Sequence, residues 1–404
     1  MIYRRFGRTN LSMPVFSCGG MRYQQTWDDA LLDVVEDENQ RNLEATIRRA
    51  LELGINHIET ARGYGTSERQ LGVCFEKLFA EGVRREDLII QSKIGPGPDA
   101  ELFRKHVLES LERLRVDYID LLGLHGINTH RLMWQSVRPG GCLEVARQLQ
   151  AEGKVRQVGF STHGPTDQIV DTLACDLHGG FDYVNLHWYY IYQQNWAAVE
   201  EATRRDIGVF IISPADKGGM LYKPTPKLVE LCKPLHPIVF NSLFCLSHPQ
   251  VHTLSIGAAR PSDFDLQVSS LELLDTAGDV LPAIEDKLRA AMHETVGRDY
   301  AERLFEGLPD WELTPGRMNI GIMLWLRGLA LAYDMTEYGQ MRYNLLGNGG
   351  HWFPGLNAAH VGSLDPDELA KAVKDSPFSE QIPALLQETH GLLGGAEVKR
   401  LSQS

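Results

Sequence analysis

The segment Tyr118-Ile-Asp-Leu-Leu-Gly-Leu-His125 is an apolar run that ends in a single histidine. A strand with one face in water would alternate apolar and polar residues, so this run predicts a strand that is covered on both faces. A second run of this kind, Val209-Phe-Ile-Ile212, lies further along the chain. Strands covered on both faces are typical of parallel sheets with helices packed against them. The two runs therefore indicate the α/β class.

The same pattern repeats through the first part of the chain, where strand signals alternate with helical periodicity. Gly7–Asn10 predicts a turn between two short extended pieces. Eight further strands are expected at residues 14–18, 55–60, 88–92, 118–125, 155–161, 183–189, 207–213 and 253–257. Eight βα units within about 250 residues favour a closed (β/α)8 TIM barrel over an open sheet. Gly19-Gly20 after the first strand is not a G-x-G-x-x-G motif, so a Rossmann domain has no direct support.

The full length of 404 residues exceeds what one barrel needs. We therefore predict a barrel over residues 1–274 and a helical C-terminal extension over residues 275–404. Helices are expected in the extension at residues 281–292, 320–333 and 366–373. The apolar stretch Asn319–Tyr333 is interrupted by Arg327, which favours a buried core helix over a membrane span. Within the barrel, Ser67-Glu-Arg-Gln70 has the pattern of a capping box and predicts a helix start.

Composition excludes several classes of protein. The formal net charge of -13 argues against a nucleic-acid partner, because such partners require basic surfaces. The six cysteines are scattered without C-x-x-C spacing, which argues against a disulfide framework and against a zinc or iron–sulfur site. No apolar run follows Arg4 and Arg5, so no signal peptide is predicted. We expect a cytoplasmic protein with no membrane partner, and nothing in the sequence indicates an oligomeric state.

Four ionisable residues fall at the ends of neighbouring predicted strands. Glu59 and Tyr64 follow the second strand, Lys93 ends the third and His125 ends the fourth. Taken singly, each has a structural explanation, such as a surface aromatic in a glycine-rich turn, a solvated lysine or a hydrogen-bonded core histidine. Active sites of parallel barrels lie at the C-terminal ends of the strands. The coincidence of all four at this rim favours a catalytic site.

These four residue types suit carbonyl reduction, which needs a proton donor at the oxygen while hydride reaches the carbon. A phenol has a pKa of about 10, and a nearby lysine ammonium favours the phenolate and lowers that pKa. A carboxylate can hold the lysine in place, and a neutral histidine can hydrogen-bond the substrate oxygen. We expect Tyr64 to be the proton donor in this arrangement.

The stretch Ile58-Glu-Thr-Ala-Arg-Gly-Tyr-Gly-Thr-Ser-Glu68 resembles the D-T-A-x-x-Y-G-x-S-E motif of the aldo-keto reductase family. The resemblance covers residues 3–274. It implies that Tyr64 is the general acid/base, that Lys93 and Glu59 modulate it, and that His125 orients the substrate. The family has Asp where this chain has Glu59, so the carboxylate sits one methylene further out. Because a misplacement of about 1 Å can cost about 100-fold in rate, the activity level stays open.

The resemblance also implies a nicotinamide cofactor and no metal. It assigns contacts with the nicotinamide half, the pyrophosphate and the adenosine end to Gly20, Met21, Arg22, Ser161, His163, Asn185, Ser213, Lys217, Gly257, Arg260 and Gln267. Arg260 can bind a 2′-phosphate through two parallel hydrogen bonds, which favours NADPH over NADH, although a surface arginine is the alternative. Thr162 and Ile212 replace the family's usual asparagine and stacking aromatic.

The C-terminal extension resembles the helical tail of some bacterial members, which binds iron–sulfur clusters through clustered cysteines. The resembling segments are Trp311–Tyr343 and His351-Trp-Phe-Pro354. This chain has no cysteine beyond Cys245, so we expect no iron–sulfur cluster. The tail is expected either to pack on the barrel or to close the substrate pocket, with Arg342, Tyr343, His351 and Trp352 as candidates.

Three functions remain in consideration. The leading hypothesis is an NADP(H)-dependent oxidoreductase that reduces an aldehyde, ketone or sugar carbonyl to an alcohol. A second is a sugar epimerase or lyase that uses tightly bound NADP transiently. A third is a catalytically weak, NADP-binding regulatory barrel, motivated by Glu59, Thr162 and Ile212. Aromatic residues that could wall the pocket are Tyr23, Trp134, Trp188 and Tyr189. Neither the substrate nor the direction of reaction is indicated.

Overall fold

The computed structural model describes residues 1–348 and 352–396, so His351 lies outside the described residues. The chain forms two compact units. Unit 1 comprises residues 1–218 and 241–277, and unit 2 comprises residues 219–240 and the described residues from 278 onward. The barrel was predicted to include residues 219–240 and to end at residue 274. In the structure, residues 219–240 group with unit 2, and unit 1 ends three residues later than predicted, at residue 277.

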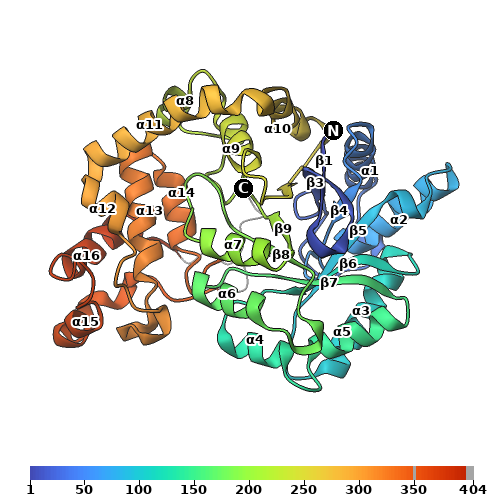
Figure 1. Ribbon diagram of the computed structural model, residues 1–404, viewed down its shortest axis with the longest axis horizontal. Coiled ribbons are helices and arrows are strands. Elements are labelled where there is room, and N and C mark those ends of the chain that lie inside the picture. Colours follow the sequence, from blue (N-terminus) through green and yellow to red (C-terminus); the bar gives the residue numbers. More distant parts are fainter. Residues whose placement is uncertain (349–351, 397–404) are drawn as a thin grey trace. The chain divides into compact units, whose positions relative to one another are not determined.

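Unit 1 contains a closed barrel of parallel strands (Figure 1). Each strand pairs with its neighbours in chain order, and the last strand, β10, pairs with the first, β3, to close the ring. The predicted (β/α)8 TIM barrel and all eight of its strands are confirmed. The strands are β3 (Phe16–Gly19), β4 (His57–Glu59), β5 (Ile89–Ile94), β6 (Ile119–His125), β7 (Val155–Ser161), β8 (Tyr183–Leu186), β9 (Gly208–Ile211) and β10 (Thr253–Ile256).

Helices surround these strands, as the alternating sequence pattern requires (Figure 1). Unit 1 contains α1 (Asp37–Glu52), α2 (Ser67–Ala80), α3 (Ala100–Leu114), α4 (His130–Val137), α5 (Cys142–Ala151), α6 (Thr166–Ala174), α7 (Trp196–Arg204) and α10 (Asp265–Ser269). Helix α9 (Pro237–Leu246) continues from unit 2 into unit 1. The capping box predicted at Ser67 is wrong. Thr66 is the N-cap residue of α2, and its side chain makes no capping hydrogen bond. The Ser67 hydroxyl instead forms hydrogen bonds with Oγ1 of Thr60 and with the carbonyl oxygen of Gly20.

An N-terminal hairpin closes the end of the barrel where the strands begin. β1 (Tyr3–Arg5) and β2 (Ser12–Pro14) pair antiparallel around the predicted turn. Apolar side chains from the hairpin join barrel residues in one buried cluster of Phe6, Met13, Ile89, Leu121, Tyr183 and Phe210. Gly7 has a φ of +51°, and a Cβ there would lie 2.5 Å from the Asp206 carbonyl oxygen. The hairpin can therefore approach the barrel this closely only with glycine at this position.

Two glycines on neighbouring strands open space inside the barrel for larger side chains. A Cβ at Gly159 would lie 2.5 Å from Cδ1 of the Tyr183 ring, and one at Gly123 would lie 2.9 Å from Cγ of Lys93. These glycines let Tyr183 fill the barrel axis and let the aliphatic part of Lys93 lie across β6. A tyrosine ring and a buried lysine therefore lie inside the barrel, where these two strands carry no side chain.

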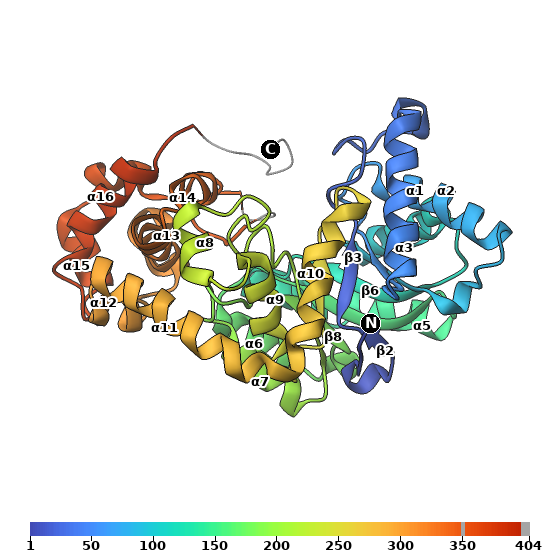
Figure 2. The same ribbon diagram turned by 90° about the horizontal axis from the view of Figure 1, so that it is seen from above.

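Unit 2 is helical, as predicted for the extension. Its helices include α8 (Pro226–Cys232), α11 (Ala277–Val296), α12 (Arg298–Arg303), α13 (Ile320–Tyr333), α14 (Thr336–Tyr343), α15 (Pro366–Ala372) and α16 (Ile382–Leu393). Helix α13 is largely buried and packs against α14 and α16 (Figure 2), which confirms the predicted core helix. Across residues 1–348 and 352–396, no helix has the length and apolar character needed to cross a membrane.

The predicted tail residues contribute to the core of unit 2. The Arg342 guanidinium is fully buried and lies 4.7 Å from the centre of the Trp352 ring and 5.5 Å from that of Tyr338. The Tyr343 hydroxyl lies 2.9 Å from Nδ1 of His390 and accepts a hydrogen bond from the Ala358 amide. These contacts give Arg342, Tyr343 and Trp352 packing roles in this unit.

Candidate active site

Glu59 and Lys93 form a buried ion pair at the C-terminal ends of β4 and β5. Their side chains are 6% and 2% exposed, and the Lys93 ammonium contacts the Glu59 carboxylate. The ammonium also donates a hydrogen bond of 2.8 Å to the Thr60 carbonyl. Burial and the charge of Lys217 lower the pKa of Lys93, whereas the contacting carboxylate favours its charged form. The pair therefore holds a cation in place inside the barrel.

The extra methylene of Glu59 is accommodated by the absence of a side chain on β3. A Cβ at Gly19 would lie 3.3 Å from Oε2 of Glu59 and 2.6 Å from the Ser255 hydroxyl. The carboxylate therefore rests against the backbone of β3 while its other oxygen reaches Lys93. The longer glutamate side chain, in place of the family aspartate, therefore still forms an ion pair with the lysine.

Tyr64 lies in the turn between β4 and α2, next to this pair. The Lys93 ammonium is 4.9 Å from the centre of the Tyr64 ring, and the His125 ring meets the Tyr64 ring edge-on with centroids 5.7 Å apart. Gly65 has a φ of +53°, and a Cβ there would lie 1.9 Å from the Thr26 carbonyl oxygen. The turn is therefore held against the loop that follows β3. The four residues predicted from strand ends lie together in one cluster.

The ionisation of Tyr64 differs from the sequence-based expectation. Burial raises the pKa of Tyr64 above its usual value, whereas Lys93 was expected to lower it. The Lys93 ammonium donates to Thr60, pairs with Glu59 and lies 4.9 Å from the centre of the Tyr64 ring. The phenol is therefore held protonated, which is the form that donates a proton.

Trp27 is a neighbour of Tyr64 that the sequence analysis missed. Its ring meets the Tyr64 ring edge-on with centroids 5.9 Å apart. Trp27 lies in the long loop between β3 and α1, which Gln70 anchors by accepting a hydrogen bond of 2.9 Å from the Gln25 amide. The signal in the sequence was the position of this tryptophan after a barrel strand, where active-site loops lie.

Other aromatic residues suggested as pocket walls have different environments. Trp134 is 59% exposed on α4, whereas Trp188 is 2% exposed and stacks on Phe244 with ring centres 5.1 Å apart. Tyr23 is 1% exposed. Trp188 and Tyr23 are therefore core residues of unit 1.

Among the predicted cofactor contacts, Asn185 at the end of β8 has the clearest geometry. Its side chain is fully buried, and neither its amide nitrogen nor its amide oxygen has a hydrogen-bond partner. A buried amide without partners costs about 1–3 kcal/mol, so a ligand that supplies a donor and an acceptor would recover this energy. A carboxamide, as on the nicotinamide ring, offers that pair of groups.

The other residues expected near the nicotinamide are already engaged. The Ser161 hydroxyl accepts a hydrogen bond of 3.1 Å from the Gly126 amide. Both ring nitrogens of His163 have partners, Nδ1 with His187 and Nε2 with Lys217. The Thr162 hydroxyl donates to the Ile127 carbonyl at 2.7 Å. Asn185 is therefore better suited than His163 to bind a carboxamide through hydrogen bonds.

Residues expected at the ribose and adenosine ends lie after β3 and β10. Gly20 donates its amide to the Glu59 carbonyl at 2.6 Å, and a Cβ at Gly20 would lie at the same distance from that oxygen. Arg22 donates to the Gly257 carbonyl at 2.8 Å. Arg260 is 72% exposed on its side chain and pairs with Asp263 at 3.2 Å. The loops after the first and last strands thus meet at Arg22.

The remaining predicted contacts are half-buried or buried. Ser213 has a φ of +52° in the loop after β9, where its carbonyl accepts the Lys217 amide at 2.9 Å. Met21 is half-buried after β3. Gln267 is fully buried on α10.

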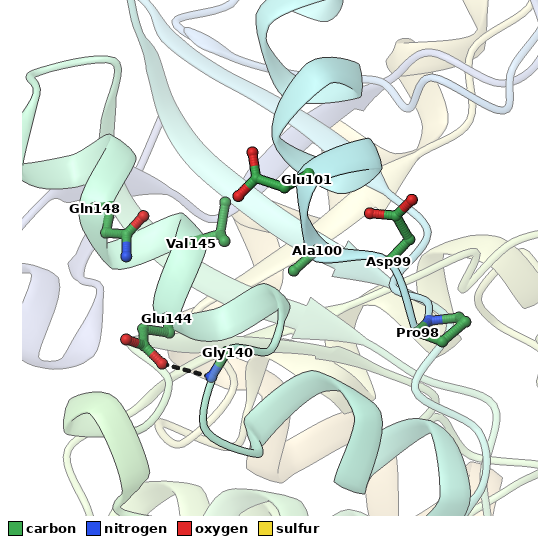
Figure 3. A pocket seen from close by; sticks show the side chains of 8 residues that line it. All are labelled: Pro98, Asp99, Ala100, Glu101, Gly140, Glu144, Val145 and Gln148. Atoms are coloured by element: carbon green, nitrogen blue, oxygen red, sulfur yellow. Dashed lines mark hydrogen bonds between the residues drawn. The ribbon is translucent and has the colours of Figure 1, made fainter.

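A separate cavity of about 440 Å³ opens between the starts of α3 and α5 (Figure 3). It is lined by Pro98, Asp99, Ala100, Glu101, Gly140, Glu144, Val145 and Gln148. Two of its carboxylates already have local partners, because Asp99 caps α3 through the Leu102 amide and Glu144 accepts from the Gly140 amide. Among the described residues, no cluster of His, Cys, Asp and Glu could hold a metal ion.

Comparisons with known proteins agree with this geometry. The profile of the Aldo/keto reductase family matches residues 16–226. L-galactose dehydrogenase of Arabidopsis thaliana is 40% identical over 124 residues, which is 29% of this chain and 37% of that protein. L-glyceraldehyde 3-phosphate reductase of Escherichia coli is 30% identical over 188 residues, which is 43% of this chain and 49% of that protein. The chain thus spans half or less of the length of these curated relatives.

A solved structure supports the fold. An aldo-keto reductase from Bacillus halodurans, in its holo form, superposes with a TM-score of 0.57 at 21% identity. The superposition covers 71% of this chain and 96% of that one. The closed barrel, the cluster of Tyr64 with Lys93 and Glu59, and the profile match over more than half of the chain agree with one another. This chain belongs to the aldo/keto reductase family.

Proposed function

We propose that this chain is an NADP(H)-dependent oxidoreductase that reduces a carbonyl group to an alcohol, with Tyr64 as the proton donor. The observation that carries the proposal is the buried cluster in which Lys93 pairs with Glu59 and faces Tyr64, while His125 lies against the same ring. A phenol held protonated beside a fixed cation can give its proton to a developing alkoxide. The cluster therefore has the groups that carbonyl reduction requires of the protein.

A bound nicotinamide would supply or accept the hydride, and the residues of this chain fit such a cofactor. Asn185 offers an unsatisfied buried amide for the carboxamide. Arg260 offers an exposed guanidinium for a 2′-phosphate, and Lys217 offers an ammonium in the loop after β9. Cations and amides of this kind allow an acidic protein to bind an anionic cofactor.

Each catalytic residue has a distinct task in this proposal. Tyr64 holds the proton at its phenol oxygen until the substrate carbonyl becomes an alkoxide. Lys93 stabilises the phenolate that remains, and Glu59 keeps the lysine fixed and charged. His125 donates a hydrogen bond that orients the carbonyl oxygen, and Trp27 excludes water beside Tyr64.

We propose a sugar or a short hydroxyaldehyde as the substrate class. The matched relatives act on L-galactose and L-glyceraldehyde 3-phosphate, according to their names. Tyr64 and Trp27 meet edge-on. Apolar ring surfaces next to the polar groups of His125 and Lys93 suit the C–H faces and hydroxyl groups of a sugar.

The proposal is tested by cofactor titration and by the Tyr64→Phe variant. We expect NADPH to bind the wild-type protein in a fluorescence titration, and Tyr64→Phe to bind it equally while losing turnover on a panel of sugar aldehydes. Tyr118→Phe is the matched control, because Tyr118 lies between Arg85 and Arg156, away from the cluster. Absence of NADPH binding by the wild type, or full turnover by Tyr64→Phe, would refute the proposal.

A further inference from the structure

The loop that carries Trp27 is held to the barrel by polar contacts rather than by an apolar core. We call residues 20–36, between β3 and α1, the Trp27 loop. Tyr23 near its start is buried, but none of residues 24–36, all of which the structure describes, is buried, and Leu31 and Val34 are exposed. Segments with few buried apolar contacts open at a low cost in free energy. The position of Trp27 therefore depends on the polar groups on either side of it.

On the N-terminal side of Trp27, backbone and amide groups attach the loop to the start of α2. The Thr66 amide donates a hydrogen bond of 3.1 Å to the Thr26 carbonyl. The Gln25 amide donates one of 2.9 Å to the side chain of Gln70. These two contacts involve no charged group, so added salt should have little effect on them.

On the C-terminal side of Trp27, a carboxylate attaches the loop to two helices. Oδ2 of Asp29 accepts a hydrogen bond of 2.7 Å from Arg113 on α3, and Oδ1 accepts one of 3.2 Å from Arg69 on α2. Nε of Arg69 also donates a hydrogen bond of 3.1 Å to the Ala30 carbonyl. Each carboxylate oxygen of Asp29 is thus bound by a different helix, two residues away from Trp27.

Arg113 is held in place by groups that do not belong to the loop. Its side chain is 7% exposed, and its guanidinium lies 3.9 Å from the carboxylate of Glu68, which is 1% exposed. Glu68 accepts hydrogen bonds from the hydroxyls of Ser92 and Ser110 at 2.5 and 3.1 Å. An isolated surface ion pair contributes little, but a pair in a charge network whose cation is already ordered loses less side-chain entropy. Asp29 therefore binds a preorganised cation.

The attachment at Asp29 is linked to the proposed proton donor by direct contact. The Trp27 ring meets the Tyr64 ring edge-on with centroids 5.9 Å apart. Loss of the Asp29 contacts would remove the ionic attachment of the loop and widen the range of positions that Trp27 can adopt. The ring would then lie against Tyr64 for a smaller fraction of the time.

We propose that Asp29 is a positioning residue, which holds the Trp27 ring against Tyr64 and thereby determines how tightly the carbonyl substrate binds beside the proton donor. Asp29 acts through Arg69 and Arg113. This inference rests on the proposed function, because it concerns the substrate side of the same site. A change at Asp29 leaves the side chains of the proposed catalytic cluster in place, so its effect is expected in KM rather than in kcat.

The first test needs no activity. In protein labelled with 5-fluorotryptophan, the Trp27→Phe variant identifies the ¹⁹F resonance of Trp27 among those of the seven tryptophans. We expect this resonance to shift or broaden in Asp29→Ala and to keep its wild-type position in Asp28→Ala, the matched control, which removes an equal charge one residue earlier. Sodium chloride at about 1 M, where the Debye length is about 3 Å, should move the wild-type resonance toward that of Asp29→Ala. The same Trp27 resonance in Asp29→Ala and wild type would overturn the proposal.

The second test separates substrate binding from turnover. Asp29→Ala should raise KM for a sugar aldehyde about fivefold, as expected for a well-placed exposed ion pair, and should change kcat and the NADPH dissociation constant less than about twofold. Asp29→Glu keeps the carboxylate and should recover most of the affinity. Arg69→Met should raise KM less than Asp29→Ala, because Arg113 remains. In the double variant it should add less than its effect alone, since both residues act through one contact.

The outcomes distinguish this inference from the proposed function. An unchanged KM in Asp29→Ala, an equal rise in Asp28→Ala, or no recovery in Asp29→Glu would refute the proposal for Asp29. A fall in kcat with unchanged KM would also refute it, because the effect would then lie in the chemical step. A wild-type protein that neither binds NADPH nor reduces any carbonyl would instead refute the proposed function, and the ¹⁹F test would still decide whether Asp29 holds Trp27.

Discussion

Glu59 and Gly19 form a matched pair, and we therefore expect that restoring the family aspartate lowers the proposed activity. In the structure, Oε1 of Glu59 reaches Lys93 while Oε2 rests against the β3 backbone at Gly19. Glu59→Asp shortens the side chain by one C–C bond, about 1.5 Å. The shorter carboxylate would withdraw from the lysine and leave its ammonium partly unpaired in a buried site.

The size of the effect follows from these distances. A displacement of about 1 Å in a catalytic arrangement can lower the rate about 100-fold, which is about 2.7 kcal/mol in the activation barrier. Glu59→Gln removes the charge altogether and leaves Lys93 buried without its partner. Breaking a buried pair in this way costs about 3–5 kcal/mol of stability. We therefore expect Glu59→Asp to lower kcat about 100-fold and Glu59→Gln to lower both kcat and the free energy of unfolding.

Gly19→Ala tests the other half of the pair. Its Cβ would lie 2.6 Å from the Ser255 hydroxyl and 3.3 Å from the Glu59 carboxylate. The double variant Gly19→Ala/Ser255→Ala removes the closest conflict and keeps those with the Ile256 carbonyl oxygen at 3.2 Å and with Glu59. We expect the double variant to recover stability but not kcat, because the carboxylate still has to move.

The assay is NADPH-dependent turnover together with urea unfolding. Gly95→Ala is the matched control, because a Cβ at Gly95, just after β5, meets no atom within 4 Å. Wild-type turnover in Glu59→Asp would refute the reasoning, since it would show that the longer side chain is not needed. Full recovery of turnover in the double variant would show that Ser255, and not Glu59, is what Gly19 accommodates.

Three further predictions concern other residues of the barrel. Asn185→Leu should raise the free energy of unfolding by about 1–3 kcal/mol, because a buried amide without partners is removed. The same variant should weaken NADPH binding, and unchanged binding would exclude Asn185 as the carboxamide contact. Arg260→Ala should weaken NADPH about tenfold by titration and leave NADH unaffected, because only NADPH carries the 2′-phosphate; equal effects on both would contradict this. Burial lowers the pKa of His57 from 6.5 to about 3. Between these two pH values the unfolded chain therefore binds a proton at His57, whereas the folded chain does not. The free energy of unfolding should therefore be greatest above pH 6.5 and fall toward pH 3, and urea unfolding of His57→Gln across this range should show a shallower fall; identical slopes would show that other groups control it.

The sequence predicted the barrel because its signals are local and repeated. A strand buried on both faces is rich in apolar residues, as in Ile119–His125 and Gly208–Ile211, and helical periodicity separates such runs along the chain. The cluster of Glu59, Tyr64, Lys93 and His125 was predictable for a related reason. Parallel strands end at one rim, so Glu59, Lys93 and His125 meet there regardless of the details of the helices.

Features that depend on contacts between distant segments were not predictable in this way. The pattern at Ser67 is that of a capping box, but its hydroxyl bonds Gly20, which is 47 residues earlier in the chain. Trp27 has no periodicity and becomes relevant only because its loop folds onto Tyr64. Helix α16 was not predicted; it carries Pro383 in its first turn, where proline is tolerated.

The two ends of the barrel differ in what their side chains contribute to stability. At the end where the strands begin, Phe6 and Met13 fill the barrel with apolar contacts that stabilise the fold. At the other end, a buried ion pair and the unsatisfied amide of Asn185 both cost folding energy. A barrel shaped only for stability would have apolar residues at Glu59, Lys93 and Asn185. A ligand that binds at this rim would repay the cost of the Asn185 amide, and this is a physical reason to propose the reaction there that does not depend on any relative.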